Sequence, residues 1–131
     1  MKALIVGDIH FDCWAEAGRD PFASLRSGDW ANLDALIVAG DLTNKPRVRW
    51  KYALRHLACH INPGRIHIVP GNHDYYDFHI DRDDRLAEIA AGEGANLAQK
   101  AEITAADTRF LCCTLWTDFA LHGDVPGSQA I

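Results

Sequence analysis

Short runs of apolar residues, rich in Ile, Leu and Val, recur along the first half of the chain, and each gives way to a glycine. The runs lie at residues 3–6, 34–39 and 66–69. Because such a run carries few polar positions on either face, it is typical of a strand that is covered on both sides in a parallel sheet. We therefore predict three parallel strands.

A helical spacing of apolar positions follows the second run. It predicts an amphipathic helix over residues 48–61 that buries a single stripe of side chains. Pro46 suits the first turn of this helix, and the Asn-Pro-Gly sequence at residues 62–64 is a signal for its end. The stripe consists of Trp50, Leu54, Leu57 and Ile61.

Weaker patterns fill the rest of the chain. Residues 81–91 are predicted to form a second helix, and residues 101–104 and 109–116 to form two strands joined by a turn. Several Gly and Pro residues interrupt residues 11–33, so we expect that segment to be irregular apart from a short helix near residues 22–26.

Polar side chains follow each of the three apolar runs. Strands that alternate with helices form right-handed βαβ units, and ligands of such sheets lie beyond the carboxyl ends of the strands. We therefore expect these polar side chains to share one site. They are Asp8 and His10 after the first run, Asp41 after the second, and Asn72, His73 and Asp74 after the third.

The side chains at this edge suit a metal-dependent hydrolase. A mixed set of carboxylate, imidazole and amide oxygen ligands favours Mn, Fe, Zn or Ni over Ca or Mg. Two ions roughly 3.5–4 Å apart, bridged by a carboxylate such as Asp41, can clamp a phosphate ester and lower the pKa of a water. His73 could protonate the leaving alkoxide, and Asp74 could fix the tautomer of His73. The alternative for Asp8, Asp41 and Asn72 is capping or turn stabilisation.

The composition of the chain narrows the class of protein further. The 131 residues suit a single domain over residues 1–131, and an apolar content of 48% is that of a globular protein. The net charge of −5 argues against a nucleic-acid or anionic-membrane surface, and the N-terminal run is too short for a membrane span. The four cysteines form no C-x-x-C pair, so we predict reduced thiols in a cytoplasmic protein.

Three motifs resemble those of the calcineurin-like metallophosphoesterase family. They are Gly7-Asp8-Ile9-His10, Gly40-Asp41-Leu42-Thr43-Asn44 and Gly71-Asn72-His73-Asp74, and the segment at residues 113–119 is similar to bacterial members. The resemblance implies that Asp8 and His10 bind the first metal, that Asp41 bridges two metals and that Asn72 binds the second. It also implies that His73 assists the leaving group with Asp74 behind it, in the hydrolysis of phosphomonoesters or phosphodiesters by metal-activated water.

The resemblance also implies an αββα sandwich of two sheets between helices. On this reading the chain is the N-terminal part of the family fold, with a nearly complete, mostly parallel first sheet and a partial second sheet. Family members carry a further lone His and a Gly-His-x-His motif, and the chain shows neither. The alternatives are therefore a catalytically weak or inactive member that serves as a binding module or vestige, or a site completed by a partner chain or a longer product.

Two further expectations concern the remaining residues. A lone hairpin is marginal and exposes its edges, so we predict a homo-oligomer formed through residues 109–119 that buries Phe110, Leu115 and Trp116. His56 and His60 lie four positions apart on the predicted helix, a spacing that can bind metal. The sequence offers no third ligand for them, so we interpret them as part of a solvated helix face.

Overall fold

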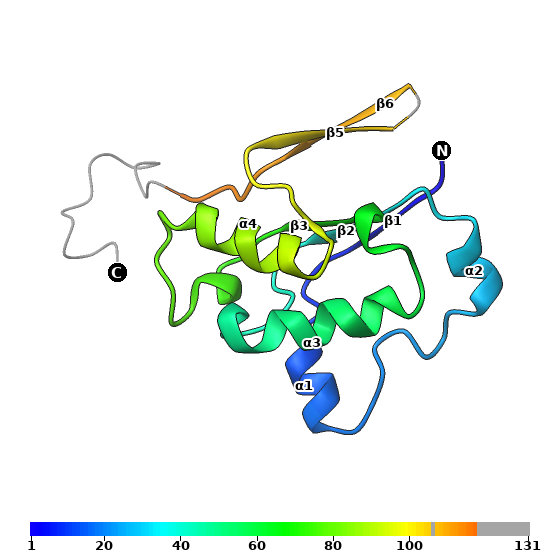
Figure 1. The fold of residues 1–131 in the computed structure, drawn as a ribbon, viewed down its shortest axis with the longest axis horizontal. Helices are drawn as coiled ribbons and strands as arrows, with labels where there is room; N and C mark the ends of the chain where they lie inside the picture. The colour runs from blue at the N-terminus through cyan, green and yellow to red at the C-terminus, as the bar shows by residue number, and fades with distance from the viewer. Residues whose placement is uncertain (106, 118–131) are drawn as a thin grey trace.

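A four-stranded parallel sheet forms the centre of the protein, whose computed structural model describes residues 1–105 and 107–117 (Figure 1). The strands stand in chain order, β1-β2-β3-β4, and all three pairings are parallel. Their bounds are Ala3–Val6 for β1, Ala35–Ala39 for β2, Ile66–Val69 for β3 and Asn96–Leu97 for β4.

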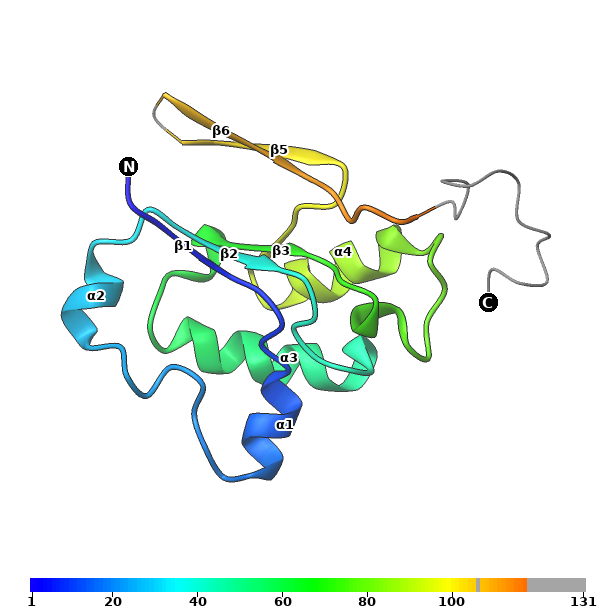
Figure 2. The ribbon, with the colours of Figure 1, turned by 180° about the vertical axis from the view of Figure 1, so that it is seen from behind.

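Helices cover one face of this sheet, as both ribbon views show (Figures 1 and 2). The apolar stripe predicted on the central helix is confirmed, since all of its members are buried in the main core with the inward side chains of β2 and β3. The short turns Pro63–Arg65 and His73–Tyr75 flank β3. The helices are α1 (Phe11–Glu16), α2 (Ser27–Ala31), α3 (Pro46–Ala58) and α4 (Asp83–Gly92).

An antiparallel hairpin lies against the opposite face of the sheet (Figure 2). It consists of β5 (Ala101–Ala105) and β6 (Thr108–Cys112). Ile103 and Cys112 pack with Ile37 of β2 in a second, smaller core, and Phe110 is partly buried against it. Phe110 therefore contributes to packing within the chain, whereas the prediction assigned it to an interface between copies.

The predicted α/β class and the elements with strong patterns are confirmed. The three apolar runs are strands, and the two longer helices and the hairpin differ from prediction only in their ends. Residues 11–33 differ, because they contain α1 and α2 rather than a helix near residues 22–26. The sequence also gave no sign of the two-residue strand β4. Among the described residues, no helix is long and apolar enough to cross a membrane.

His67 provides a pH test of this packing. It is half-buried on β3, on the face that carries Val69, and burial lowers the pKa of its imidazole below 6.5. The unfolded chain therefore takes up the proton first, so the stability that neutral His67 contributes is complete above about pH 6.5 and is lost as the pH falls.

We expect urea unfolding of His67→Gln to show a smaller loss of stability between about pH 7.5 and pH 5.5 than the wild type. His79→Gln, at an exposed position, serves as the control and should retain the wild-type dependence. An unchanged pH dependence in His67→Gln would contradict the assignment.

Candidate metal centre

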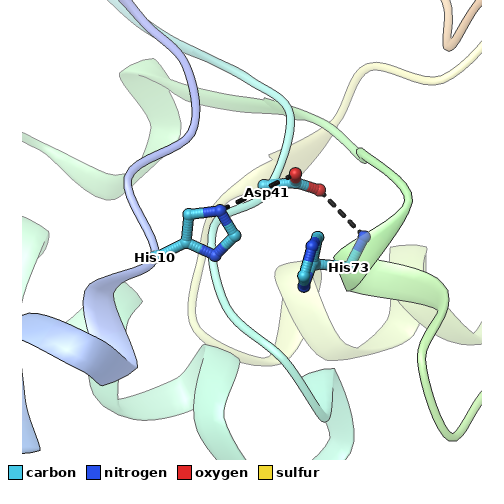
Figure 3. Close-up of side chains that lie close together, drawn as sticks. All are labelled: His10, Asp41 and His73. Carbon is cyan, nitrogen blue, oxygen red and sulfur yellow. Dashed lines mark hydrogen bonds and ion pairs between the residues drawn. The ribbon is translucent and has the colours of Figure 1, made fainter.

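Three side chains from three strand ends lie together at the carboxyl edge of the sheet (Figure 3). His10 follows β1, Asp41 follows β2 and His73 opens the turn after β3, and their potential ligand atoms all lie within 4.8 Å of one another. His10 Nε2 is 3.9 Å from Asp41 Oδ2. The imidazole rings of His10 and His73 meet edge to face, with their centroids 4.7 Å apart.

Asp41 connects the loops that form this cluster. Its backbone carbonyl accepts a 2.9 Å hydrogen bond from the His10 N–H, and its Oδ1 accepts one of 2.9 Å from the His73 N–H. The loop after β3 approaches so closely that a Cβ on Gly71 would lie 2.2 Å from Asp41 Oδ1. Position 71 therefore requires glycine.

Left-handed backbone conformations mark the same loops. Asp8 has a φ of 51°, His10 of 45° and Asp41 of 55°. This region costs a non-glycine residue roughly 1–2 kcal/mol, although Asp and His tolerate it better than most. Strained residues of this kind concentrate at functional sites, where the surrounding contacts hold them in place. The conformation therefore points to a function for this edge beyond packing.

Asn44 orients the imidazole of His73. The Asn44 Nδ2 group donates a 3.1 Å hydrogen bond to Asp12 Oδ2, and a carboxylate accepts only, so the amide orientation is fixed. Asn44 Oδ1, 2.9 Å from His73 Nδ1, must then accept a hydrogen bond from the Nδ1–H group. Arg49 in turn contacts Asp12, so that Asn44, Asp12 and Arg49 form a row behind the His73 ring. The contact with Asn44 involves Nδ1 of His73 and not Nε2.

Asp74 binds backbone rather than the neighbouring imidazole. Its carboxylate is fully buried. Burial raises its pKa, and hydrogen bonds from four N–H groups oppose that rise. Oδ2 accepts from Gly71 N at 2.9 Å and Leu42 N at 3.3 Å. Oδ1 accepts from Thr43 N at 3.2 Å and from the Trp50 indole at 2.9 Å. The predicted contact of Asp74 with the His73 ring is thus made by Asn44 instead.

The other two predicted ligands lie at the edge of the site. Asp8 and Asn72 are both exposed, and Asp8 is not a member of the three-residue cluster. Asn72 Nδ2 donates a 3.2 Å hydrogen bond to the Tyr76 hydroxyl, and the Tyr76 ring packs on His73 with centroids 4.4 Å apart. The structure thus brings three of the predicted site residues together. It adds Asn44, which the sequence reasoning had quoted only as a member of a motif.

The sequence of the chain also matches a known protein family. Residues 1–125 match the calcineurin-like phosphoesterase family. The chain belongs to that family. No curated protein and no solved structure gives a significant match.

Membership of the calcineurin-like phosphoesterases supports a metal-dependent phosphoesterase in general terms, because the family is hydrolytic and typically binds divalent metals. The predicted fold class agrees with the match, since the described residues form a parallel sheet with a small antiparallel sheet beside it. The His10 imidazole and the Asp41 carboxylate are ligands of the kinds that suit first-row transition ions, and the His73 imidazole lies beside them.

A cleft of about 580 Å³ opens beside the three-residue cluster. Asn44 and Tyr76, which both contact His73, form part of its wall. Its two cationic side chains are already paired: Lys45 lies 3.4 Å from Asp77, and Arg49 binds Asp12. The cleft therefore carries no excess of positive charge.

Because Asp74 accepts four hydrogen bonds, we predict a large loss of stability when Asp74→Asn replaces one of its two oxygens by an NH₂ group. Each oxygen accepts two hydrogen bonds, so in either orientation the NH₂ group of Asp74→Asn would face two N–H donors. We expect urea denaturation to show a loss of about 3 kcal/mol in the free energy of unfolding. Asp81→Asn, at an exposed position, should change stability by less than about 0.5 kcal/mol. Equal stabilities would contradict the assigned role.

Proposed function

We propose that the chain is a phosphoesterase that hydrolyses phosphomonoesters or phosphodiesters with metal-activated water. The observation that carries the proposal is the convergence of His10, Asp41 and His73 from three strand ends. Packing alone would not require two imidazoles and a buried carboxylate to meet at one sheet edge. Nor would it require His10 and Asp41 to adopt left-handed backbone there.

His10 and Asp41 would hold the ion, with Asp8 and Asn72 as further ligands from the same loops. Asp8 lies two positions before His10, Asn72 directly precedes His73, and both side chains are exposed. When bound, a divalent metal such as Mn²⁺ would supply a water of lowered pKa and neutralise charge on the phosphoryl oxygens. Asp41 would serve as the bridging ligand if two ions bind.

His73 would act as the general acid. Its Nδ1–H is held by Asn44, so the proton that reaches the leaving alkoxide would come from Nε2. Asp74 would act as a positioning residue, because it fixes the loop after β3 through the Gly71 N–H and the loop after β2 through the Leu42 N–H. The row Asn44, Asp12 and Arg49 would keep the imidazole orientation constant through the proton transfer.

The alcohol part of the substrate would occupy the cleft beside His73. Because both cations of the cleft are paired with carboxylates, the cleft suits an uncharged leaving group better than a second phosphate. A nucleic-acid partner is not part of this proposal, given the net charge of −5. The proposal includes a cytoplasmic location, supported by four cysteines that are all free thiols.

A second candidate function is a family member that binds metal or ligand without turnover. The exposed position of Asp8, outside the three-residue cluster, favours it. The two functions differ in one measurable respect, because both require metal binding but only the first requires hydrolysis.

Hydrolysis of bis-p-nitrophenyl phosphate by the purified chain with excess Mn²⁺ tests the choice. We expect turnover of this activated ester, and with an alkyl ester such as glycerol 2-phosphate, whose leaving alkoxide needs a proton, we expect turnover to fall by about 10²–10⁴-fold in His73→Gln through loss of the general acid. In Asp41→Asn, turnover should fall together with Mn²⁺ affinity. His79→Gln is the matched control and should retain activity. Stoichiometric Mn²⁺ binding with no turnover would favour the binding module, and neither binding nor turnover would refute both candidates.

We also propose a homo-oligomer that forms through the hairpin and the residues after it. Leu111 is 79% exposed, Leu115 88% and Trp116 48%, which leaves apolar area for a second copy to cover. Asp118 and Phe119, which the prediction included, lie outside the described residues.

Sedimentation velocity of Leu111→Glu/Leu115→Glu tests this interface. We expect the wild type to sediment as an oligomer and the double variant as a monomer. The reason is that the free energy required to bury two unpaired carboxylates would exceed the free energy of association. Ile80→Glu, which changes an exposed apolar residue elsewhere, should leave the oligomer intact. A wild-type monomer at high concentration would overturn the proposal.

A further inference from the structure

A second group of potential metal ligands lies at the far end of α3. Asp20, His56 and His60 each offer one atom, and these atoms all lie within 4.8 Å of one another. His56 belongs to the last turns of α3, about 15 Å along the helix from Pro46, where the helix leaves the strand-end site. The group is therefore separate from the candidate metal centre.

The structure supplies the third ligand that the sequence did not offer. His56 and His60 are four positions apart and present their rings on one side of α3, with centroids 5.3 Å apart. Asp20 comes from the segment between α1 and α2, 36 positions before His56 in the sequence (56 − 20). Two imidazole nitrogens and one carboxylate oxygen leave a fourth position for water, a ligand set typical of zinc.

The contact between His56 and Asp20 has the geometry of two ligands of one ion. His56 Nε2 lies 3.2 Å from Asp20 Oδ1. The nitrogen is nevertheless buried and makes no hydrogen bond. Ligand atoms on a tetrahedral zinc ion, with bonds of about 2.0–2.1 Å, lie roughly 3.3 Å apart. A buried nitrogen at this separation with no hydrogen bond is therefore placed as a metal would require.

The surroundings of the group hold each ligand in place. The backbone N–H of Phe22 donates a 2.8 Å hydrogen bond to Asp20 Oδ1 and so fixes the carboxylate. The Trp30 indole stacks on His60 at 4.9 Å with an interplanar angle of 18°, and Phe11 packs on His56 at 4.9 Å. An ordered outer shell of this kind orients metal ligands and limits the access of water.

We propose that Asp20, His56 and His60 form a zinc site that joins the segment between α1 and α2 to α3. Held there, the ion would cross-link an irregular part of the chain to a core helix, and a water would take its fourth position. The proposal does not depend on the phosphoesterase activity, since no residue is shared between the two sites.

Zinc titration of the full chain tests the site, with the strand-end site disabled by His10→Gln/His73→Gln. Calorimetry of this background chain should give about one equivalent of Zn²⁺, and its melting temperature should rise with Zn²⁺, because the ion binds only the folded chain. Added to this background, His60→Gln should weaken binding by at least about 100-fold, since changes that merely perturb an outer shell already cost 10–100-fold.

Two further variants keep the result interpretable. Asp20→Asn, also on the background chain, should reproduce the loss of zinc affinity while leaving the melting temperature of the metal-free protein unchanged. His79→Gln removes a histidine outside the group and should leave zinc affinity unchanged. Co²⁺ should quench Trp30 fluorescence through the stacked His60 ring, and His60→Gln should abolish that quenching. Equal zinc affinities with and without His60 would overturn the proposal.

Discussion

The buried carboxylate of Asp74 is the contact on which the rest of the structure depends. It accepts hydrogen bonds from the loop after β2, from the loop after β3 and from the Trp50 indole of α3. A buried carboxylate without partners would be severely destabilising, so its four donors must be held at these positions. The loops that carry Asp41 and His73 are thereby fixed to each other and to the central helix.

As a consequence, the loop that carries Asp41 in the candidate metal centre is held rigidly in its left-handed backbone conformation. Asp41 is buried, sits on left-handed backbone and receives the N–H of His73, while Gly71 leaves no room for any side chain against it. Such a loop cannot relax by rotation of one residue, because each contact restrains the next. The chain belongs to the calcineurin-like phosphoesterases, a family that typically binds divalent metals. Such a restraint suits metal binding, because converging ligands must be held in place before an ion arrives.

Much of the fold could be predicted because its strongest signals are local. The apolar runs of β1, β2 and β3 and the stripe on α3 each follow from a period that neighbouring residues display. Strand β4 has two residues, α1 six and α2 five, lengths too short to display a period.

The site was predictable only as far as the topology places strand ends together. Sequence reasoning identified His10, Asp41 and His73 by this route. It could not identify Asn44 as the partner of the His73 ring, because that contact depends on a helix start folding back over another loop. The approach of Asp20 to His56 was equally hidden, since the intervening residues give no sign of where that segment lies.

The order of the strands also bears on how the protein is made. Because β1, β2, β3 and β4 stand side by side in the order of synthesis, each new strand meets a partner that has already left the ribosome. No strand of this sheet has to be inserted between two others. The paired residues are 32 positions apart for Ala3 and Ala35, 30 for Leu36 and Ile66 and 29 for His67 and Asn96, so each pairing closes a loop of one βαβ unit and none closes a longer one.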